Sequence, residues 1–519
     1  MSNVAKATVG LMVATILSKI LGFSRELFLA SYYGATTYSD IYLTAYNIPS
    51  VLFSALAAAI ATTFIPLYYE NYSLYKKEGA FTNNVFNIVV YITILIALIS
   101  CIYSKPIVKL FAIGFRGETL EITVQFTRIM VFSIVFLGLS NVITAFLQVN
   151  NNFIISGLIG IPLNIIIIVS IILSSKYNPY ILPIGTLIAI SSQFLFQIPA
   201  AKKIGYKYNP VINLNDEYIK KMIWLVGPVF IGVAVNQINT MVDRTLASTL
   251  QAGSISALNY ANRLNNFVMG LFITSISAVI YPMLSKLSAE NDELKFSESV
   301  SRSINSVILL VMPISIGAIV LAKPIVGLLF ERGAFDEKAT YMTSIALVFY
   351  SIGMVSFGLR DILGKVFYSL QDTKTPMMNG AIAMGLNIVL NLILVRFMGH
   401  AGLAFATSIS TIVCIFMLFG SLKKKINYFG QDKIIKTTIK SLVAAISMGI
   451  ITSITYKILK LLLEIGSLGE LIALFGSIGI GAIIYGVLVI VFKVEEVSFI
   501  YELIKSKIKK QSLQIISKY

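Results

Sequence analysis

The chain has 519 residues, of which 57% are hydrophobic and 13% are charged, and its formal net charge is +17. Soluble globular domains carry about 25% charged residues, so this chain has too little polar surface for a water-soluble fold. Apolar stretches of about 20 residues recur between short polar breaks, which predicts an all-α polytopic membrane protein. The sequence does not show the alternating segments of about ten residues that are typical of a membrane β-barrel.

The positive charge is concentrated in alternate loops. Lysines cluster at Lys76–Lys77, Lys202–Lys203, Lys220–Lys221, Lys423–Lys425 and Lys505–Lys510. The intervening loops near Gly34, Gly253 and Gly402 are nearly free of Lys and Arg. This alternation follows the positive-inside rule. It predicts that both termini lie in the cytoplasm, and it argues against nucleic acid as a partner.

About fourteen membrane-spanning helices are predicted. In chain order they begin near Ala7, Ser39, Asn84, Thr123, Asn152, Tyr180, Ile219, Ser254, Ser301, Lys338, Pro376, Ala401, Ile435 and Gly469. The first apolar run is interpreted as a span because it is too long for a signal peptide and carries charge in its outer part. The basic, amphipathic segment 494–519 is expected to lie on the cytoplasmic face.

The sequence repeats itself. Lys105–Val108 reads Lys-Pro-Ile-Val and recurs as Lys323–Val326. Further pairs are Phe64–Pro66 with Ile280–Pro282, Leu147–Gln148 with Leu370–Gln371, Asn164 with Asn387, and Gly185–Ala189 with Gly402–Ala406. Six spans per repeat is an even number, so the two copies are parallel, with a substrate site expected between them near the midplane. The predicted organisation is an N-lobe (1–215), a C-lobe (216–430) and two further spans (431–493).

Charged residues fall inside the predicted spans, where they are costly and usually face a wet interior. The basic ones include Lys19, Arg25, Arg244 and Arg263, and the acidic ones include Glu26, Asp40 and Asp243. Arginine binds phosphate through two parallel bonds, so a cavity lined by these cations indicates a phosphate-bearing substrate. The alternative is a set of structural ion pairs between helices, which would include Arg244 and Glu26.

A second group of residues is polar. Asn387 and Asn391 are four residues apart and share a helix face, and Thr407 lies in the next span, four residues after Leu403. With Asp243 they could supply oxygen ligands to a hard monovalent cation. The alternative is ordinary hydrogen bonding between helices.

The sequence contains no nucleotide-binding loop, metal-ligand motif or nucleophile–His pair. His400 is the only histidine, and Cys101 and Cys414 lie in different halves of the chain. We therefore expect no enzyme activity and no cofactor. Transport would then be driven by an ion gradient, by the membrane potential or by substrate supply.

Short motifs along the whole chain carry a family resemblance. They are Ser18–Glu26, Gly34–Ala35, Asp40, Ile48–Pro49, Phe64–Pro66, Val242–Ser248, Tyr260–Leu264, Phe330–Phe335 and Phe367–Pro376. Together they resemble the MurJ (MviN) lipid II flippases of the multidrug/oligosaccharidyl-lipid/polysaccharide exporter superfamily. The resemblance implies a V-shaped pair of lobes that carries undecaprenyl-pyrophosphate-linked disaccharide-pentapeptide to the outer leaflet for peptidoglycan synthesis. It further implies a monomer in a bacterial plasma membrane, surrounded by membrane lipids, with the cell-wall synthesis machinery as a candidate partner.

The resemblance also assigns roles to matching positions. Arg25 and Arg263 match arginines thought to hold the pyrophosphate, Lys19 replaces an arginine that is usual there, and Asp40 matches a functional acidic residue. A sodium site of the family matches Asp243, Asn387, Asn391, Thr407 and the backbone carbonyl of Leu403. Asn391 stands where an Asp can stand. The last two spans would form a groove for the lipid tail. The chain departs from the family at Ser50–Phe53, where many members have a Leu-Leu-Arg-Arg run, so one cavity cation is missing.

Three other functions remain open from the sequence. The first is a flippase for another polyprenyl-linked glycan, such as a teichoic acid, capsule or O-antigen unit, because the lipid pyrophosphate is common to all of them. The second is a cation-coupled drug antiporter of the same superfamily, which predicts an acidic cavity where this one is basic. The third is a membrane glycosyltransferase, which would need catalytic carboxylates in a sizeable outer loop, whereas the outer loops here are short.

Overall fold

The computed structural model describes residues 3–75, 80–290, 292–463 and 466–496, and this part of the chain is helical without a β-strand. Two compact units are distinguished. Unit 1 comprises Met1–Ala257 and Arg332–Ala339, and unit 2 comprises Leu258–Glu331 and Thr340–Tyr519. The predicted all-helical fold is therefore confirmed.

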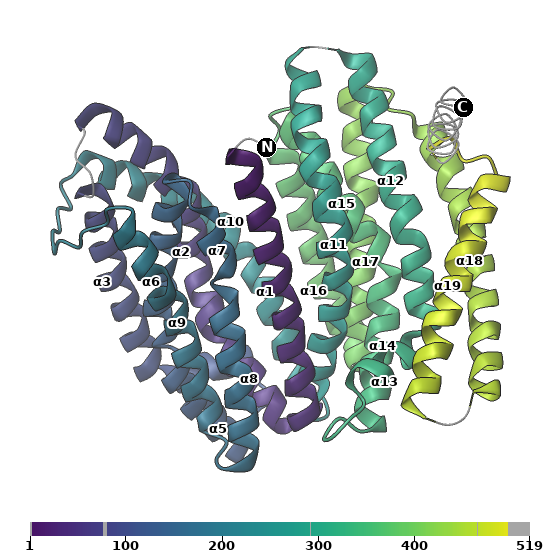
Figure 1. The fold of residues 1–519 in the computed structure, drawn as a ribbon, viewed down its shortest axis with the longest axis horizontal. Helices are drawn as coiled ribbons and strands as arrows, with labels where there is room; N and C mark the ends of the chain where they lie inside the picture. The colour runs from purple at the N-terminus through teal and green to yellow at the C-terminus, as the bar shows by residue number, and fades with distance from the viewer. Residues whose placement is uncertain (1–2, 76–79, 291, 464–465, 497–519) are drawn as a thin grey trace, which may run out of the picture. The chain divides into compact units, whose positions relative to one another are not determined.

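Unit 1 contains the first ten described helices (Figure 1). They are α1 (Asn3–Tyr33), α2 (Thr37–Tyr75), α3 (Ala80–Ile102), α4 (Ser104–Phe111), α5 (Gly117–Met130), α6 (Ser133–Val149), α7 (Phe153–Leu158), α8 (Gly160–Lys176), α9 (Ile181–Lys203) and α10 (Glu217–Ala247). Helix α10, which was predicted to open the second lobe, packs against α2 and lies in unit 1. The boundary between the compact units thus falls at Ala257, whereas the repeat boundary predicted at residue 215 remains a statement about the sequence.

The second unit begins within α11. Its helices are α11 (Ser254–Ala289), α12 (Glu293–Val320), α13 (Ala322–Phe330), α14 (Glu337–Ile352), α15 (Met354–Ser369), α16 (Lys374–Met398), α17 (His400–Ile426), α18 (Gln431–Leu462) and α19 (Ser467–Val491). Helices α18 and α19 pack on each other, and α18 packs on α12, so the two additional helices attach to the second repeat. The predicted amphipathic tail lies mostly at 497–519, outside the described residues.

Eleven helices of the described chain are long and apolar enough to cross a membrane, or twelve if α14 and α15, bent by 45°, form one span. Helices α1 and α10 are not among them, yet each has 31 residues. At about 1.5 Å per residue each is about 46 Å long, more than the roughly 30 Å hydrocarbon core. All predicted helix starts agree with the structure to within a few turns, and the largest difference is α12, which begins at Glu293 rather than Ser301. The total of fourteen spans remains a prediction.

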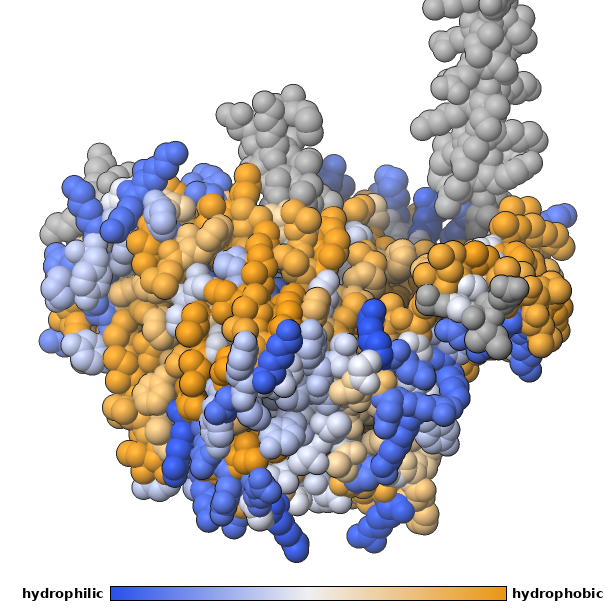
Figure 2. All heavy atoms as spheres, turned by 60° about the horizontal axis from the view of Figure 1, so that its bottom comes forward, coloured by the Kyte–Doolittle hydropathy of each residue, from blue (hydrophilic) through white to orange (hydrophobic). Residues whose placement is uncertain are grey.

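Large apolar side chains lie on the surface. Phe397 is 81% exposed, Trp224 78% and Tyr177 77%, and Figure 2 shows broad apolar areas along the helices in view. Such exposure is unfavourable in water but expected against lipid, where each helix satisfies its own backbone hydrogen bonds. The surface therefore supports a multi-pass membrane protein.

The sequence repeat has a structural counterpart. The repeated Lys-Pro-Ile-Val motif forms two short helices, α4 and α13, each followed by a turn and a longer helix. The prolines of the second repeated motif, Pro66 and Pro282, both lie inside helices. Asn151 and Gln371, each two residues after the end of a helix (α6 and α15), both have a positive φ (59° and 58°). The two halves therefore reproduce the same order of elements.

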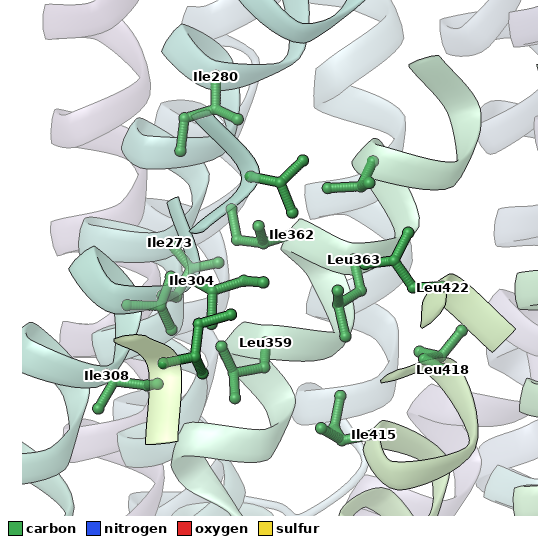
Figure 3. Close-up of a cluster of buried hydrophobic side chains, with 14 of the residues drawn as sticks. Ile273, Ile280, Ile304, Ile308, Leu359, Ile362, Leu363, Ile415, Leu418 and Leu422 are labelled. Atoms are coloured by element: carbon green, nitrogen blue, oxygen red, sulfur yellow. The ribbon is translucent and has the colours of Figure 1, made fainter. Parts of the chain in front are cut away.

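The core of unit 2 is a cluster of aliphatic side chains from α11, α12, α15 and α17 (Figure 3). Ile273, Ile304, Ile362 and Leu363 are at most 2% exposed. This burial fixes α12 against α15, and α15 against α17. Two of these helices, α11 and α17, also carry Arg263 and Thr407, which are described below.

Loop accessibility provides a test of the predicted orientation. Gly253 and His400, which are predicted to lie in outer loops, are buried, so exposed neighbours are better reporters. With both termini in the cytoplasm, we expect cysteines replacing Lys203 or Lys424 to react with an impermeant maleimide only after the cells are opened. Cysteines replacing Tyr177 or Gln251 should react in intact cells. The opposite pattern at either pair would contradict the cytoplasmic termini.

Candidate functional site

A charge pair lies within α1. A guanidinium nitrogen of Arg25 is 2.7 Å from a carboxylate oxygen of Glu26, and the two side chains are 12% and 4% exposed. The Arg25 guanidinium also lies 5.5 Å from the ring centroid of Tyr46 on α2, a cation–π arrangement. These two contacts fix the orientation of the Arg25 guanidinium, while part of the side chain remains accessible. Glu26, predicted as a functional acidic residue, therefore positions Arg25.

The other predicted cations are placed differently. Lys19 is exposed on α1, which continues as an α-helix through Gly22. Arg244 is half-buried on α10 and donates a hydrogen bond of 3.1 Å to the backbone carbonyl of Leu43 on α2. Arg244 thus links two helices of unit 1 through a backbone carbonyl, whereas the structural alternative expected an ion pair. Arg263 is exposed on α11 in unit 2.

Asp40 holds the N-terminal end of α11. Its carboxylate accepts hydrogen bonds from the backbone N–H of Gly253 (2.7 Å) and of Ser256 (2.8 Å), and a further bond from the Ser256 hydroxyl. Asp40 is 4% exposed. A carboxylate on free N–H groups at a helix start is stabilised by the helix dipole. The carboxylate therefore has a defined structural task, fixing the α10–α11 turn against the start of α2.

Two glycines close the same end of unit 1 by direct backbone contact. Gly253 has a φ of +88°, and a Cβ there would lie 2.1 Å from the carbonyl oxygen of Ala35. Gly333 has a φ of +61°, and a Cβ there would lie 2.3 Å from the carbonyl oxygen of Ser31. The next residue, Ala334, donates its N–H to the same Ser31 oxygen (2.8 Å). Only glycine fits this approach without displacement.

A polar stripe on α11 was not predicted. Asn259, Asn262 and Asn266 share a helix face with Arg263, at spacings of three, four and seven residues. Asn266 donates a side-chain hydrogen bond to Asn262. The helical spacing of these amides is a signal in the sequence from which the stripe is predictable. Amides are suited to hydroxyl groups of a bound solute because they both donate and accept.

Asn387, Asn391 and Thr407 lie together in unit 2, as their spacing predicted. Asn391 donates to the Oδ1 atom of Asn387 (3.0 Å), Asn387 donates to the Oγ1 atom of Thr407 (3.4 Å), and Thr407 donates to the carbonyl oxygen of Leu403 (2.9 Å). Asn387 and Asn391 are 2% and 0% exposed. Asp243 is half-buried on α10 in unit 1. Amide, hydroxyl and carbonyl oxygens fit a hard cation chemically.

One motif of the resemblance has a structural explanation. Asp372 caps α16: its carboxylate accepts from the backbone N–H of Thr375 (3.0 Å) and from its hydroxyl (2.7 Å). Lys425 adds a bond of 2.8 Å, and this ammonium holds the pKa of Asp372 well below its usual range. The Gln371–Pro376 turn is therefore a helix cap rather than a binding site.

An apolar groove of about 460 Å³ lies beside the α11 stripe. Leu264 and Phe267, which follow Arg263 on α11, line it together with Pro313 and Gly317 of α12 and Gly481 of α19. A groove of this composition accepts an apolar chain. Leu264, the first lining residue on α11, follows Arg263 directly in the sequence.

Charges kept inside membrane helices despite their cost are typical of proteins that move a solute or an ion. Together with the all-helical, multi-pass fold they define a membrane transporter. A family model described as lipid II flippase MurJ matches residues 29–507. The chain belongs to this family, which is one of transporters rather than enzymes.

Individual relatives agree. A probable lipid II flippase MurJ of Vibrio cholerae is 33% identical over 427 residues, covering 79% of this chain and 81% of the relative. That of Haemophilus influenzae is 32% identical and covers 84% and 89%. A solved lipid II flippase MurJ in an inward closed conformation superposes with a TM-score of 0.77 at 28% identity, covering 93% of this chain and 98% of that one. A multidrug resistance MATE transporter shares the fold, with a TM-score of 0.67 at 15% identity, over 82% and 99% of the two chains.

Proposed function

We propose that this protein is a lipid II flippase, which moves the undecaprenyl-pyrophosphate-linked disaccharide-pentapeptide from the inner to the outer leaflet by alternating access. The observation that carries the proposal is membership of a family whose relatives, over most of both chains, are named for this activity. The half-buried Arg25, kept inside a membrane helix with its own carboxylate partner, supports it. It is the kind of group that a pyrophosphate requires in a low-dielectric setting.

The substrate-binding roles follow from the side chains. Arg25 and Arg263 each bind the pyrophosphate through the guanidinium fork, and Lys19 adds positive charge. Arg244, which is bonded to α2, contributes mainly by positioning. The asparagines beside Arg263 bind hydroxyls of the glycan. The groove that begins at Leu264 accepts the first part of the polyprenyl tail, since a tail must leave the pyrophosphate along an apolar path.

Asp40 acts on the transport cycle rather than on the substrate. Its bonds to Gly253 and Ser256 stabilise one arrangement of the outer helix ends. Asp40 and both of its partners belong to unit 1. The carboxylate would therefore keep this end of the unit in one arrangement while the transporter alternates between its states.

Sodium is proposed as the coupling ion. Asn387, Asn391, Thr407 and the carbonyl of Leu403 would supply its oxygens, with the carboxylate of Asp243 supplying charge. The sodium gradient would then shift the equilibrium between the conformational states of the transporter. We expect sodium to raise the melting temperature of the purified protein, and Asp243→Asn and Asn387→Ala to remove this effect. Potassium at equal ionic strength is the control, and no sodium-specific shift in the wild type would contradict the proposal.

The protein is proposed to work as a monomer in the bacterial plasma membrane, with both termini in the cytoplasm and with the cell-wall synthesis machinery as a partner. The decisive experiment for the function is complementation. The gene should restore growth, and the outer-leaflet pool of lipid II, in cells depleted of their own lipid II flippase. Growth without a restored outer-leaflet pool, or failure with normal expression, would instead favour another polyprenyl-linked glycan as the substrate.

A further inference from the structure

Unit 2 contains a second apolar cavity, separate from the groove beside Arg263. Its volume is about 670 Å³, and it lies between α12, α15, α17 and α18. Ile308, Leu359 and Ile415, labelled in Figure 3, line it. Met312 and Ile316 of α12 face this cavity, whereas Pro313 and Gly317 face the other one. The two cavities therefore use different faces of the same helix.

The cavity is long enough for an extended acyl chain. Along α18 its lining runs from Gln431, the first residue of the helix, to Leu442. Eleven steps at about 1.5 Å give about 16 Å. Along α12 the lining continues to Ile319, one residue before the end of that helix. The cavity therefore starts at the end of α18 that adjoins the lysine-rich turn and runs along the helices away from it.

The cavity ends at a positive charge. Lys423, on the last turn of α17, lines it and is exposed, and no ion pair to Lys423 occurs in the described part of the chain. Two carboxylates of the neighbouring segments are already engaged, because Asp372 binds Lys425, two residues after Lys423, and Asp432 accepts a bond from Tyr428. The Lys423 ammonium is therefore available to an anion from outside the protein.

We propose that this cavity binds an anionic glycerophospholipid, with an acyl chain between α12, α15, α17 and α18 and the headgroup phosphate on Lys423. Basic pockets between membrane helices at the cytoplasmic side are typical sites for anionic headgroups. A zwitterionic lipid would fill the same apolar space but would gain less from Lys423. The inference does not depend on the transported substrate, since the bilayer itself supplies the ligand.

Two substitutions separate the parts of the site. Gly420 lines the cavity, and a Cβ there would meet nothing within 4 Å, so Gly420→Leu is chosen to place its side chain in this space. Gly385→Leu on α16 is the matched control, because a Cβ there also meets nothing and the residue lines neither cavity. Lys423→Gln removes the charge. Lys424→Gln changes the next lysine, which does not line the cavity.

The test is native mass spectrometry of the full chain in detergent, titrated with phosphatidylglycerol or with phosphatidylcholine of the same acyl chains. We expect about fivefold tighter binding of phosphatidylglycerol, the preference given by about one lysine near a headgroup. Lys423→Gln should abolish this preference, and Gly420→Leu should weaken binding of both lipids at least tenfold. Lys424→Gln and Gly385→Leu should bind as the wild type does. Thermal unfolding without added lipid checks that all variants are folded.

Three results would overturn the proposal. The first is wild-type binding by Gly420→Leu. The second is an equal loss in Lys423→Gln and Lys424→Gln, which would indicate a diffuse basic loop. The third is displacement of the phospholipid by undecaprenyl phosphate at the site sensitive to Gly420→Leu, which would assign the cavity to the substrate tail. Because the measurement involves no transport, failure of the flippase proposal would leave its outcome unchanged.

Discussion

Removing the Arg25–Glu26 pair should abolish transport while leaving the fold intact. Each charged hydrogen bond from the Arg25 fork to a pyrophosphate is worth about 1.5–3 kcal/mol. The single change Arg25→Ala is ambiguous, because it breaks the 2.7 Å pair with Glu26, a carboxylate that is 3% exposed, and breaking a buried pair costs about 3–5 kcal/mol. The double variant Arg25→Met, Glu26→Gln removes both charges at similar volume. We expect it to express and melt like the wild type but to support no growth of flippase-depleted cells.

Two comparisons sharpen this result. Arg25→Lys keeps the charge but loses the fork, so growth and the outer-leaflet pool of lipid II should be partly restored. The control is Arg302→Met, Glu298→Gln, which removes a similar pair on α12 whose side chains are 63% and 56% exposed. Exposed pairs contribute about 0–1 kcal/mol, so this control should grow normally. Normal growth of the Arg25→Met, Glu26→Gln variant would mean that Arg25 does not bind the pyrophosphate.

The helices were predictable from the sequence because hydropathy and length depend on nearby residues. The starts of α11 and α17 agree with the predictions to within one residue. The proximity of the sodium-site candidates could also be predicted from the sequence, because Asn387 and Asn391 lie on one helix and Thr407 lies on the next. The repeat predicted two matching halves, and the structure adds that the repeated Lys-Pro-Ile-Val motif forms the short helices α4 and α13.

What could not be predicted depends on contacts between distant residues. Asp40 was identified as important, but its partners Gly253 and Ser256 are more than 200 residues away. Arg244 was assigned to the substrate, with an ion pair between helices as the alternative, and its bond to the Leu43 carbonyl about 200 residues away had no signal in the sequence. The association of residues 332–339 with unit 1 also has no signal in hydropathy, since it rests on a backbone bond to Ser31.

The close approach of Gly333 to the Ser31 carbonyl leads to a second prediction, for the variant Gly333→Ala. A Cβ at Gly333 would lie 2.3 Å from the Ser31 carbonyl oxygen, and its φ is +61°. Gly117 is a matched control, because its φ is +52° but a Cβ there would meet nothing within 4 Å. Both alanines carry the left-handed strain of about 1–2 kcal/mol. Gly333→Ala alone adds the steric displacement, about 1–3 kcal/mol more.

We therefore expect Gly333→Ala to release residues 332–339 from the end of α1 and to reduce lipid II transport strongly, while Gly117→Ala remains close to the wild type. A cysteine at Ala339, which is 3% exposed, reports the release through its rate of maleimide labelling. The rate should rise in Gly333→Ala and stay low in Gly117→Ala. Equal labelling and equal growth of the two variants would show that the close approach at Ser31 is not needed for transport. A defect shared by both would trace the effect to backbone strain. The contrast between the two alanines thus isolates the contact itself, because φ is nearly the same and only the neighbouring oxygen differs.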